Sequence, residues 1–235
     1  PVALCKEDKK PNIVLILADD MGYGDLAIQN PESKIPTPNL DQLARDGMRF
    51  TDAHSPSAVC SPTRYSIMTG RYAWRGRLKK GVLWPWDPPL LEEKRMTIAH
   101  LMQAAGYDTA LIGKWHLGWH WPTKDDIPLN NNDTGETVDF SRPIGGVPIT
   151  AGFDYYFGDD VPNFPPFAFI ENDQVTAIPN VLKPDSMFGS TKGVMVNVWD
   201  LRAVMPKIKN KSVEYIRSRR NLHDNKPFFL FVSLT

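Results

Sequence analysis

Short apolar runs alternate with amphipathic segments along most of the chain. Residues 12–18 (NIVLILA) are continuously apolar and β-branched, which is typical of a parallel-sheet strand covered on both faces. Residues 37–47 follow as a predicted helix, with a threonine cap, proline in the first turn and a closing glycine. The pattern of residues 48–54 (MRFTDAH) predicts a second strand after that helix.

The same alternation continues to the last residue. Ser61 and Pro62 begin a predicted helix with residues 63–69 as its body and Gly70 as its stop, so that Cys60 lies just before its first turn. The next predicted elements are a helix over 97–105, a strand over 107–112, an amphipathic helix over 206–219 and a buried strand over 227–234.

Such alternation predicts an α/β fold with a mostly parallel sheet and helices on both faces. Ligands of such sheets bind at the carboxyl ends of the strands. Residues 75–89, 119–152 and 159–200 are rich in Pro, Trp, Asn and Gly and lack clear periodicity, so we expect long loops there. Loops of this length commonly shape a substrate site.

Composition narrows the class of protein. A chain of 235 residues with 42% hydrophobic and 11% aromatic side chains can build a sizeable core and is not disordered. Its 27 basic and 27 acidic residues cancel, so no overall field would gather nucleic acid or an anionic membrane. The sequence contains no apolar run long enough for a transmembrane helix, so we expect neither partner, and any anion site must be local.

Three clusters carry candidate chemistry. Asp19 and Asp20 follow the first strand, where they would repel each other unless a cation holds them, although a helix cap or turn is the simpler interpretation of such a pair taken alone. Cys60 at a helix start, with Arg64 one turn later, favours a reactive or anionic group; the alternative is a buried structural cysteine.

Lys114 and His116 form the third cluster. They lie two residues apart after a strand and would point the same way in an extended chain, although a solvated lysine and a structural histidine are the simpler interpretation. All three clusters fall at the same edge of the predicted sheet, and this coincidence favours a catalytic site.

Three segments resemble the formylglycine-dependent sulfatases in order and approximate spacing. They are residues 11–25 (PNIVLILADDMGYGD), residues 60–64 (CSPTR) followed by Thr69-Gly70-Arg71, and residues 113–118 (GKWHLG). Residues 37–41 and 227–230 also resemble segments of that family. The resemblance implies an alkaline-phosphatase-like sulfatase catalytic domain and hydrolysis of an aryl or carbohydrate sulfate monoester.

The resemblance also implies a role for each matching residue. Cys60 would be oxidised by a formylglycine-generating enzyme, and one hydroxyl of the hydrated aldehyde would attack sulfur while the second later expels sulfate. Asp19 and Asp20, with residue 60, would bind calcium in preference to magnesium. Arg64 would hold the diol and the charge on the metal side, Lys114 would bind the sulfate, and His116 would hydrogen-bond the diol and line the substrate site.

The family pattern extends beyond this sequence, with further metal and acid residues and a smaller C-terminal domain. We therefore expect residues 1–235 to be the N-terminal portion of a single sulfatase catalytic domain that binds calcium weakly alone, unless loop acids such as Asp159 and Asp160 complete the site. The resemblance suggests a periplasmic, secreted or lysosomal protein.

Two other functions remain open at this point. One is hydrolysis of phosphate or phosphonate esters, which is found in the same superfamily. The other is binding of sulfated glycans without catalysis, in which Trp84, Trp86, Trp119 and Trp121 would stack on sugar rings.

Overall fold

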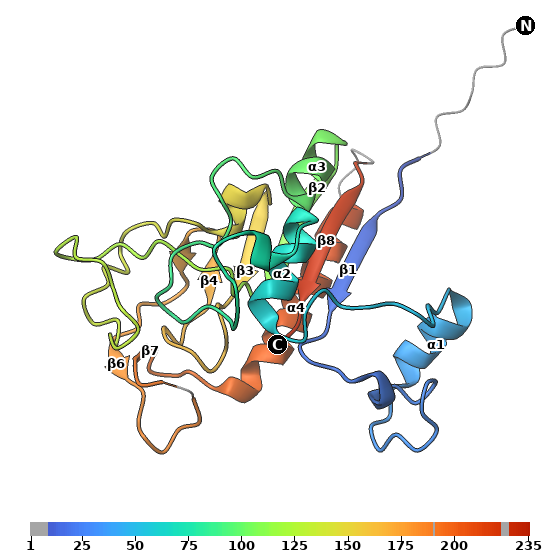
Figure 1. Cartoon of the computed structure of the whole chain (residues 1–235), viewed down its shortest axis with the longest axis horizontal. Coiled ribbons are helices and arrows are strands. Elements are labelled where there is room, and N and C mark those ends of the chain that lie inside the picture. The colour runs from blue at the N-terminus through green and yellow to red at the C-terminus, as the bar shows by residue number, and fades with distance from the viewer. Residues whose placement is uncertain (1–8, 190, 222–225) are drawn as a thin grey trace, which may run out of the picture.

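A computed structural model describes residues 9–189, 191–221 and 226–235 (Figure 1). Its helices are α1 (Pro38–Asp46), α2 (Cys60–Thr69), α3 (Ile98–Ala104) and α4 (Val204–Asn221), with short 3-10 turns at Tyr23–Asp25, Ala73–Arg75, Pro148–Ala151 and Leu201–Ala203. Its strands are β1 (Ile13–Leu17), β2 (Asp108–Gly113), β3 (Tyr155–Gly158), β4 (Ile170–Glu171), β5 (Gln174–Val175), β6 (Val181–Leu182), β7 (Val194–Met195) and β8 (Phe228–Ser233). No helix in the described ranges is long and apolar enough to cross a bilayer.

The main sheet has the order β1-β8-β2-β3-β4-β5. The first four strands are parallel neighbours, and β4 and β5 extend the sheet antiparallel. The prediction of a mostly parallel sheet is therefore confirmed. In this register Leu17, Ser233 and Gly113 lie side by side, so the segments after β1, β8 and β2 leave the sheet at one edge.

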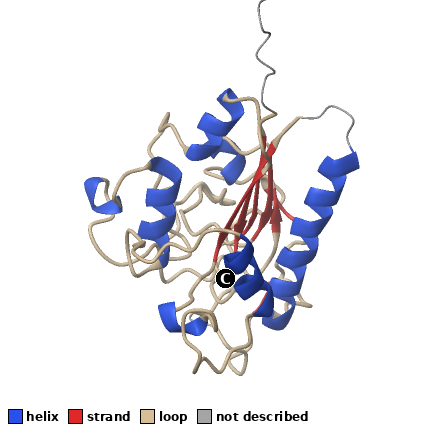
Figure 2. Ribbon diagram, turned by 90° about the vertical axis from the view of Figure 1, so that its right-hand side faces the viewer, coloured by secondary structure: helices blue, strands red, loops and turns tan. Residues whose placement is uncertain are grey.

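Helices cover both faces of the sheet, as predicted (Figure 2). On one face, Tyr65 and Met68 of α2 and Ala99 of α3 join a core with Phe229 and Phe231. On the other face, the apolar side of α4 packs on β2, β3 and β8 and shares a second core with their alternate residues. Because both faces of β2 and β8 are buried, the sequences of these two strands are nearly continuous apolar runs.

Two expectations for the N-terminal region are wrong. Residues 12–18 do form a strand, but β1 is covered on one face only: Val14 and Ile16 are 44% and 56% exposed, because α4 packs on β8, β2 and β3 instead. Residues 48–54 form no strand, and Met48 and Phe50 are 79% and 72% exposed, since no described strand lies beside them to complete a ladder.

The long loops are more structured than their sequence indicates. Residues 159–200 contain four two-residue strands, β4 to β7, and residues 119–152 are pinned by isolated bridges such as His120 to Gly145. Their tryptophans belong to the interior: Trp86 and Trp119 are 5% and 1% exposed, and Trp121 packs against both rings. The idea that these three side chains stack on sugars is therefore wrong, and only Trp84 remains open.

Candidate active site

Four of the predicted site residues meet at the carboxyl edge of the sheet. Asp19 follows β1, Cys60 and Arg64 lie in the first turns of α2, and Lys114 follows β2. Asp19 Oδ2 accepts from Arg64 and from Lys114, each at 2.7 Å. Cys60 Sγ lies 3.7 Å from Asp19 Oδ1 and 3.3 Å from Lys114 Nζ. A sulfur atom, a carboxylate and two cations thus form one cluster.

Asp19 is charged within this cluster. Burial by itself would raise the pKa of Asp19, but hydrogen bonds and charge from Lys114 and Arg64 outweigh it and lower that pKa below its ordinary value. The carboxylate in turn fixes both cations, which come from different elements, Arg64 from α2 and Lys114 from the segment after β2.

Arg64 is buried, unlike a surface arginine, with 2% of its surface area exposed. Its guanidinium donates to the Lys114 carbonyl at 2.8 Å, to the Leu234 carbonyl at 3.3 Å and to the Ser233 hydroxyl. Ser233 Oγ also donates to the Lys114 carbonyl at 2.7 Å. Sequence reasoning missed Ser233, although its position at the end of a predicted strand placed it at the same edge.

Cys60 is the first residue of α2 rather than the residue before it. Its thiol is free, and no side chain caps the N-terminus of the helix. The unpaired amides of the first turn therefore favour negative charge beside Cys60. Cys60 lines an open cavity of about 480 Å³ together with Asp19, Asp20 and Arg64. Asp20 is exposed and faces this cavity without joining the ion pairs.

His116 lies at the same edge but is bonded elsewhere. It is 2% exposed, its Nε2 lies 2.9 Å from the Leu83 carbonyl, and its backbone N–H donates to Asp160 at 3.1 Å. Because a carbonyl only accepts, Nε2 carries the proton and Nδ1 is an acceptor, and Nδ1 has no partner within the described residues. Burial, followed by the charge of Lys114, lowers the pKa of His116 to about 3. The ring is neutral at physiological pH.

A buried acid pair lies behind the loop that carries Lys114 and His116. Burial raises the pKa of Asp159 to about 7, reinforced by the neighbouring Asp160, and burial raises the pKa of Asp160 to about 6. The Asp159 carbonyl accepts from Trp115 N–H at 2.9 Å, which ties the pair to that loop. The two acids follow β3, a four-residue strand too short for its pattern to be recognised.

These acids do not complete a metal site. Asp19 and Asp20 supply the hard carboxylate oxygens that calcium prefers, but calcium takes about six to eight ligands. The described ranges contain no group of three or more His, Cys, Asp or Glu side chains arranged to hold a metal ion. The alternative that Asp159 and Asp160 complete the site has no support within the described ranges, and the residues present there offer only part of a calcium site.

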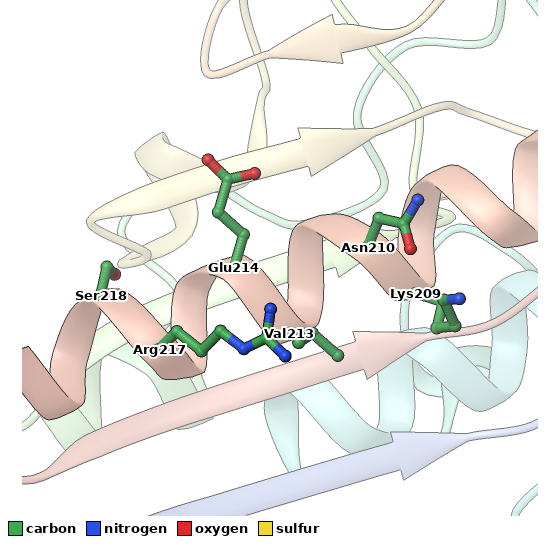
Figure 3. A pocket seen from close by; sticks show the side chains of 6 residues that line it. All are labelled: Lys209, Asn210, Val213, Glu214, Arg217 and Ser218. Atoms are coloured by element: carbon green, nitrogen blue, oxygen red, sulfur yellow. The ribbon is translucent and has the colours of Figure 1, made fainter.

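A second hollow runs along the outer face of α4 (Figure 3). Lys209, Val213, Glu214, Arg217 and Ser218 line it, so its charges are mixed. The Ser218 hydroxyl donates to the Tyr215 carbonyl at 2.7 Å, so no base activates it as a nucleophile. It lies on the face of the sheet opposite α2 and provides no competing active site.

Comparison with known proteins is consistent with this geometry. The family model described as Sulfatase matches residues 11–235. Arylsulfatase G of Canis lupus familiaris is 42% identical over 152 residues, which are 64% of this chain and 23% of that protein. An N-acetylgalactosamine-6-O-sulfatase of Bacteroides thetaiotaomicron is 28% identical over an alignment of 258 positions, gaps included, which covers 97% of this chain and 48% of that protein.

A solved structure gives the same picture. Its title concerns the metabolism of multiple glycosaminoglycans by Bacteroides thetaiotaomicron, and it superimposes with a TM-score of 0.76 at 28% identity, covering 97% of this chain and 51% of that one. The chain thus spans about half the length, or less, of the proteins that it matches.

Proposed function

We propose, from the premise that the chain belongs to the sulfatase family, that it carries the nucleophile and the anion-binding groups of a sulfuric ester hydrolase with the alkaline-phosphatase-like fold. The observation that carries this proposal is the position of Lys114 Nζ, 3.3 Å from Cys60 Sγ and 2.7 Å from Asp19 Oδ2. A fixed cation thus stands beside the residue that would attack.

Lys114 and Arg64 suit a substrate that stays negatively charged throughout the reaction. A sulfate monoester carries its charge into the transition state, so catalysis requires cations that are already in position. Arg64 is fixed by carbonyl and hydroxyl acceptors, and Lys114 is fixed by Asp19 and by its own backbone bond to Ser233 at 2.9 Å. Little reorganisation is then needed when the ester binds.

Cys60 is the residue that we expect to be converted to formylglycine, through an encounter with a formylglycine-generating enzyme. Support comes from its Cys-x-Pro-x-Arg context, its free thiol and its place in the wall of the open cavity. The hydrated aldehyde would supply the nucleophilic hydroxyl and a second hydroxyl for release of sulfate. A thiol has no second group of that kind.

His116 would act as a hydrogen-bond acceptor. Its proton is committed to the Leu83 carbonyl, which leaves Nδ1 to accept from a hydroxyl group on residue 60. The bond to Asp160 holds the backbone of the loop and therefore the ring. This role differs from that of a proton donor, because a pKa near 3 keeps the ring neutral.

Asp19 and Asp20 are the groups that we propose as calcium ligands, with the other ligands supplied by groups outside the described ranges. Calcium would add positive charge beside residue 60. Asp19, which pairs with Lys114 and Arg64, would hold the metal as well, so both cations would keep more of their charge for the sulfate group.

Turnover of matched esters tests the proposal. Protein from a host that has the converting enzyme is assayed on an aryl sulfate, the corresponding phosphate and the corresponding phosphonate, with Cys60→Ala as the control. We expect hydrolysis of the sulfate, lost in the control. Preference for the phosphate or phosphonate would show that the protein is a phosphate or phosphonate ester hydrolase of the same superfamily. Binding of a sulfated sugar without hydrolysis of any ester would indicate a catalytically silent glycan-binding protein.

A further inference from the structure

A small hollow adjoins the candidate active-site cavity. It has a volume of about 140 Å³ and shares Ser57 and Val59 with the cavity that contains Cys60. Its far wall is formed by Tyr72, Trp74 and neighbouring residues of one segment, residues 71–81. The two hollows are therefore neighbours, and a molecule that occupies both would pass Ser57 and Val59.

Two aromatic rings form an open platform on residues 71–81. Tyr72 and Trp74 are 50% and 56% exposed, and their rings stack with centroids 5.6 Å apart and planes 15° from parallel. Most other tryptophans of the long loops are buried, as Trp86 and Trp119 show. Two exposed, preorganised rings beside a cavity are typical of a ligand site, since flat aromatic faces pack well against sugar rings.

The same segment is strongly basic. Residues 71–81 contain no acid and carry five cations, Arg71, Arg75, Arg77, Lys79 and Lys80, in a chain with no net charge. The Arg75 guanidinium lies 5.5 Å from the centre of the Trp74 ring, and Lys79 donates to the Trp74 carbonyl at 2.8 Å. Among the described residues, Arg71 is the one cation of this segment that forms an ion pair, and its partner is Glu92. The cations beside the platform thus remain able to attract an anion.

We propose that residues 71–81 form a subsite for a second anionic sugar, so that the substrate class is a polyanionic glycan rather than an isolated sulfate ester. Tyr72 and Trp74 contact the sugar ring, while Lys79 and Lys80 contact its sulfate or carboxylate group. The assignment of this glycan as substrate depends on the proposed function at Cys60, whereas its binding to the subsite does not.

Calorimetric titration tests the subsite without relying on turnover. The chain is titrated with a sulfated glycosaminoglycan hexasaccharide and with one of its monosulfated monosaccharides. Trp74→Ala and the double variant Lys79→Glu with Lys80→Glu should each weaken hexasaccharide binding at least about tenfold. The monosaccharide should bind all of them alike. All these side chains are exposed, so the variants should fold.

A matched charge reversal on the opposite face provides the control. Lys207→Glu with Lys209→Glu changes two exposed lysines of α4, of which Figure 3 shows Lys209, and should leave hexasaccharide affinity within about twofold. Equal losses in both double variants, or unchanged binding in the first, would overturn the subsite. Equally tight binding of a single-stranded DNA of the same charge would show a general polyanion surface and overturn the glycan assignment. Absence of ester hydrolysis contradicts only the proposed function.

Discussion

The two sides of the candidate active site are built very differently. Cys60 and Arg64 lie in α2 and Lys114 follows β2, and neighbouring elements bury α2 and β2 on several sides, as the 1% exposure of Met68 in α2 shows. Asp19 comes from β1, an edge strand with one exposed apolar face. In α1, which Figure 1 shows apart from the sheet, Leu43 is 65% exposed. Apolar periodicity thus determines whether a segment forms a helix or a strand, whereas the burial of that helix or strand depends on which elements pack against it.

The largest expected effect is the difference in stability loss between removing the buried cation Arg64 and removing the surface cation Arg45. Arg64→Ala leaves Asp19 with one partner fewer and removes a donor from the Lys114 and Leu234 carbonyls and the Ser233 hydroxyl, so it should lower the free energy of unfolding by about 3–5 kcal/mol. Arg45→Ala, in exposed α1, should change it by less than about 0.5 kcal/mol. Urea denaturation of both variants measures the difference; similar values would mean that the site is not preorganised.

The next comparison uses apolar truncations on two helices. Met68→Ala in α2 should cost about 2–5 kcal/mol, because it opens a cavity in a closed core. Leu43→Ala in α1 should cost less than about 1 kcal/mol, since its side chain is mostly in solvent. Equal costs in thermal or chemical unfolding would show that α1 is packed against something in solution.

These two helices also show how far the sequence alone could go. Both were predicted from caps, proline and apolar spacing, and the strands after α3 and α4 were predicted from their apolar runs. The edge rule for parallel sheets then brought Asp19, Cys60, Arg64 and Lys114 together.

What could not be predicted has physical reasons. The strands β3 to β7 have two to four residues each, too few for periodicity to appear. Residues 48–54 show the converse: a sequence typical of a strand forms one only where a neighbouring strand pairs with it. The position of the proton on the His116 ring depends on the Leu83 carbonyl, 33 residues away in the chain, and no local sequence pattern predicts such a contact.

A third prediction concerns catalysis rather than stability. Lys114→Ala removes the cation nearest residue 60 and should cost about 2–4 kcal/mol of transition-state stabilisation, measured as kcat/KM on an aryl sulfate. Lys10→Ala, at the far end of the sheet where Lys10 donates to Ala105, is the control and should leave kcat/KM unchanged. If Lys114→Ala retains nearly full kcat/KM, Lys114 does not bind the sulfate.

A fourth prediction concerns the pH dependence of stability that arises from Asp159, the acid behind the site. The pKa of Asp159 is raised from 3.8 to about 7, so the folded protein binds a proton there that the unfolded chain has lost. Its contribution to stability is complete below about pH 4 and is lost as the pH rises through 7. Asp159→Asn should flatten that slope in denaturation measured from pH 4 to 8.

His116 has the opposite dependence. Its lowered pKa stabilises the fold above pH 6.5, and this contribution is lost as the pH falls toward 3. Because both proteins contain His116, the difference between wild type and Asp159→Asn isolates the acid. Parallel profiles for the two proteins would show that Asp159 is not the source of the slope.

The central claim is that residue 60 carries the chemistry of sulfate ester hydrolysis. Mass spectrometry of the peptide that contains residue 60, on protein from a host with the converting enzyme and with measured sulfatase activity, tests it most directly. The account predicts a peptide in which the sulfur atom and two hydrogens are replaced by one oxygen, in proportion to activity. Full activity from protein in which Cys60 is entirely unmodified would contradict it.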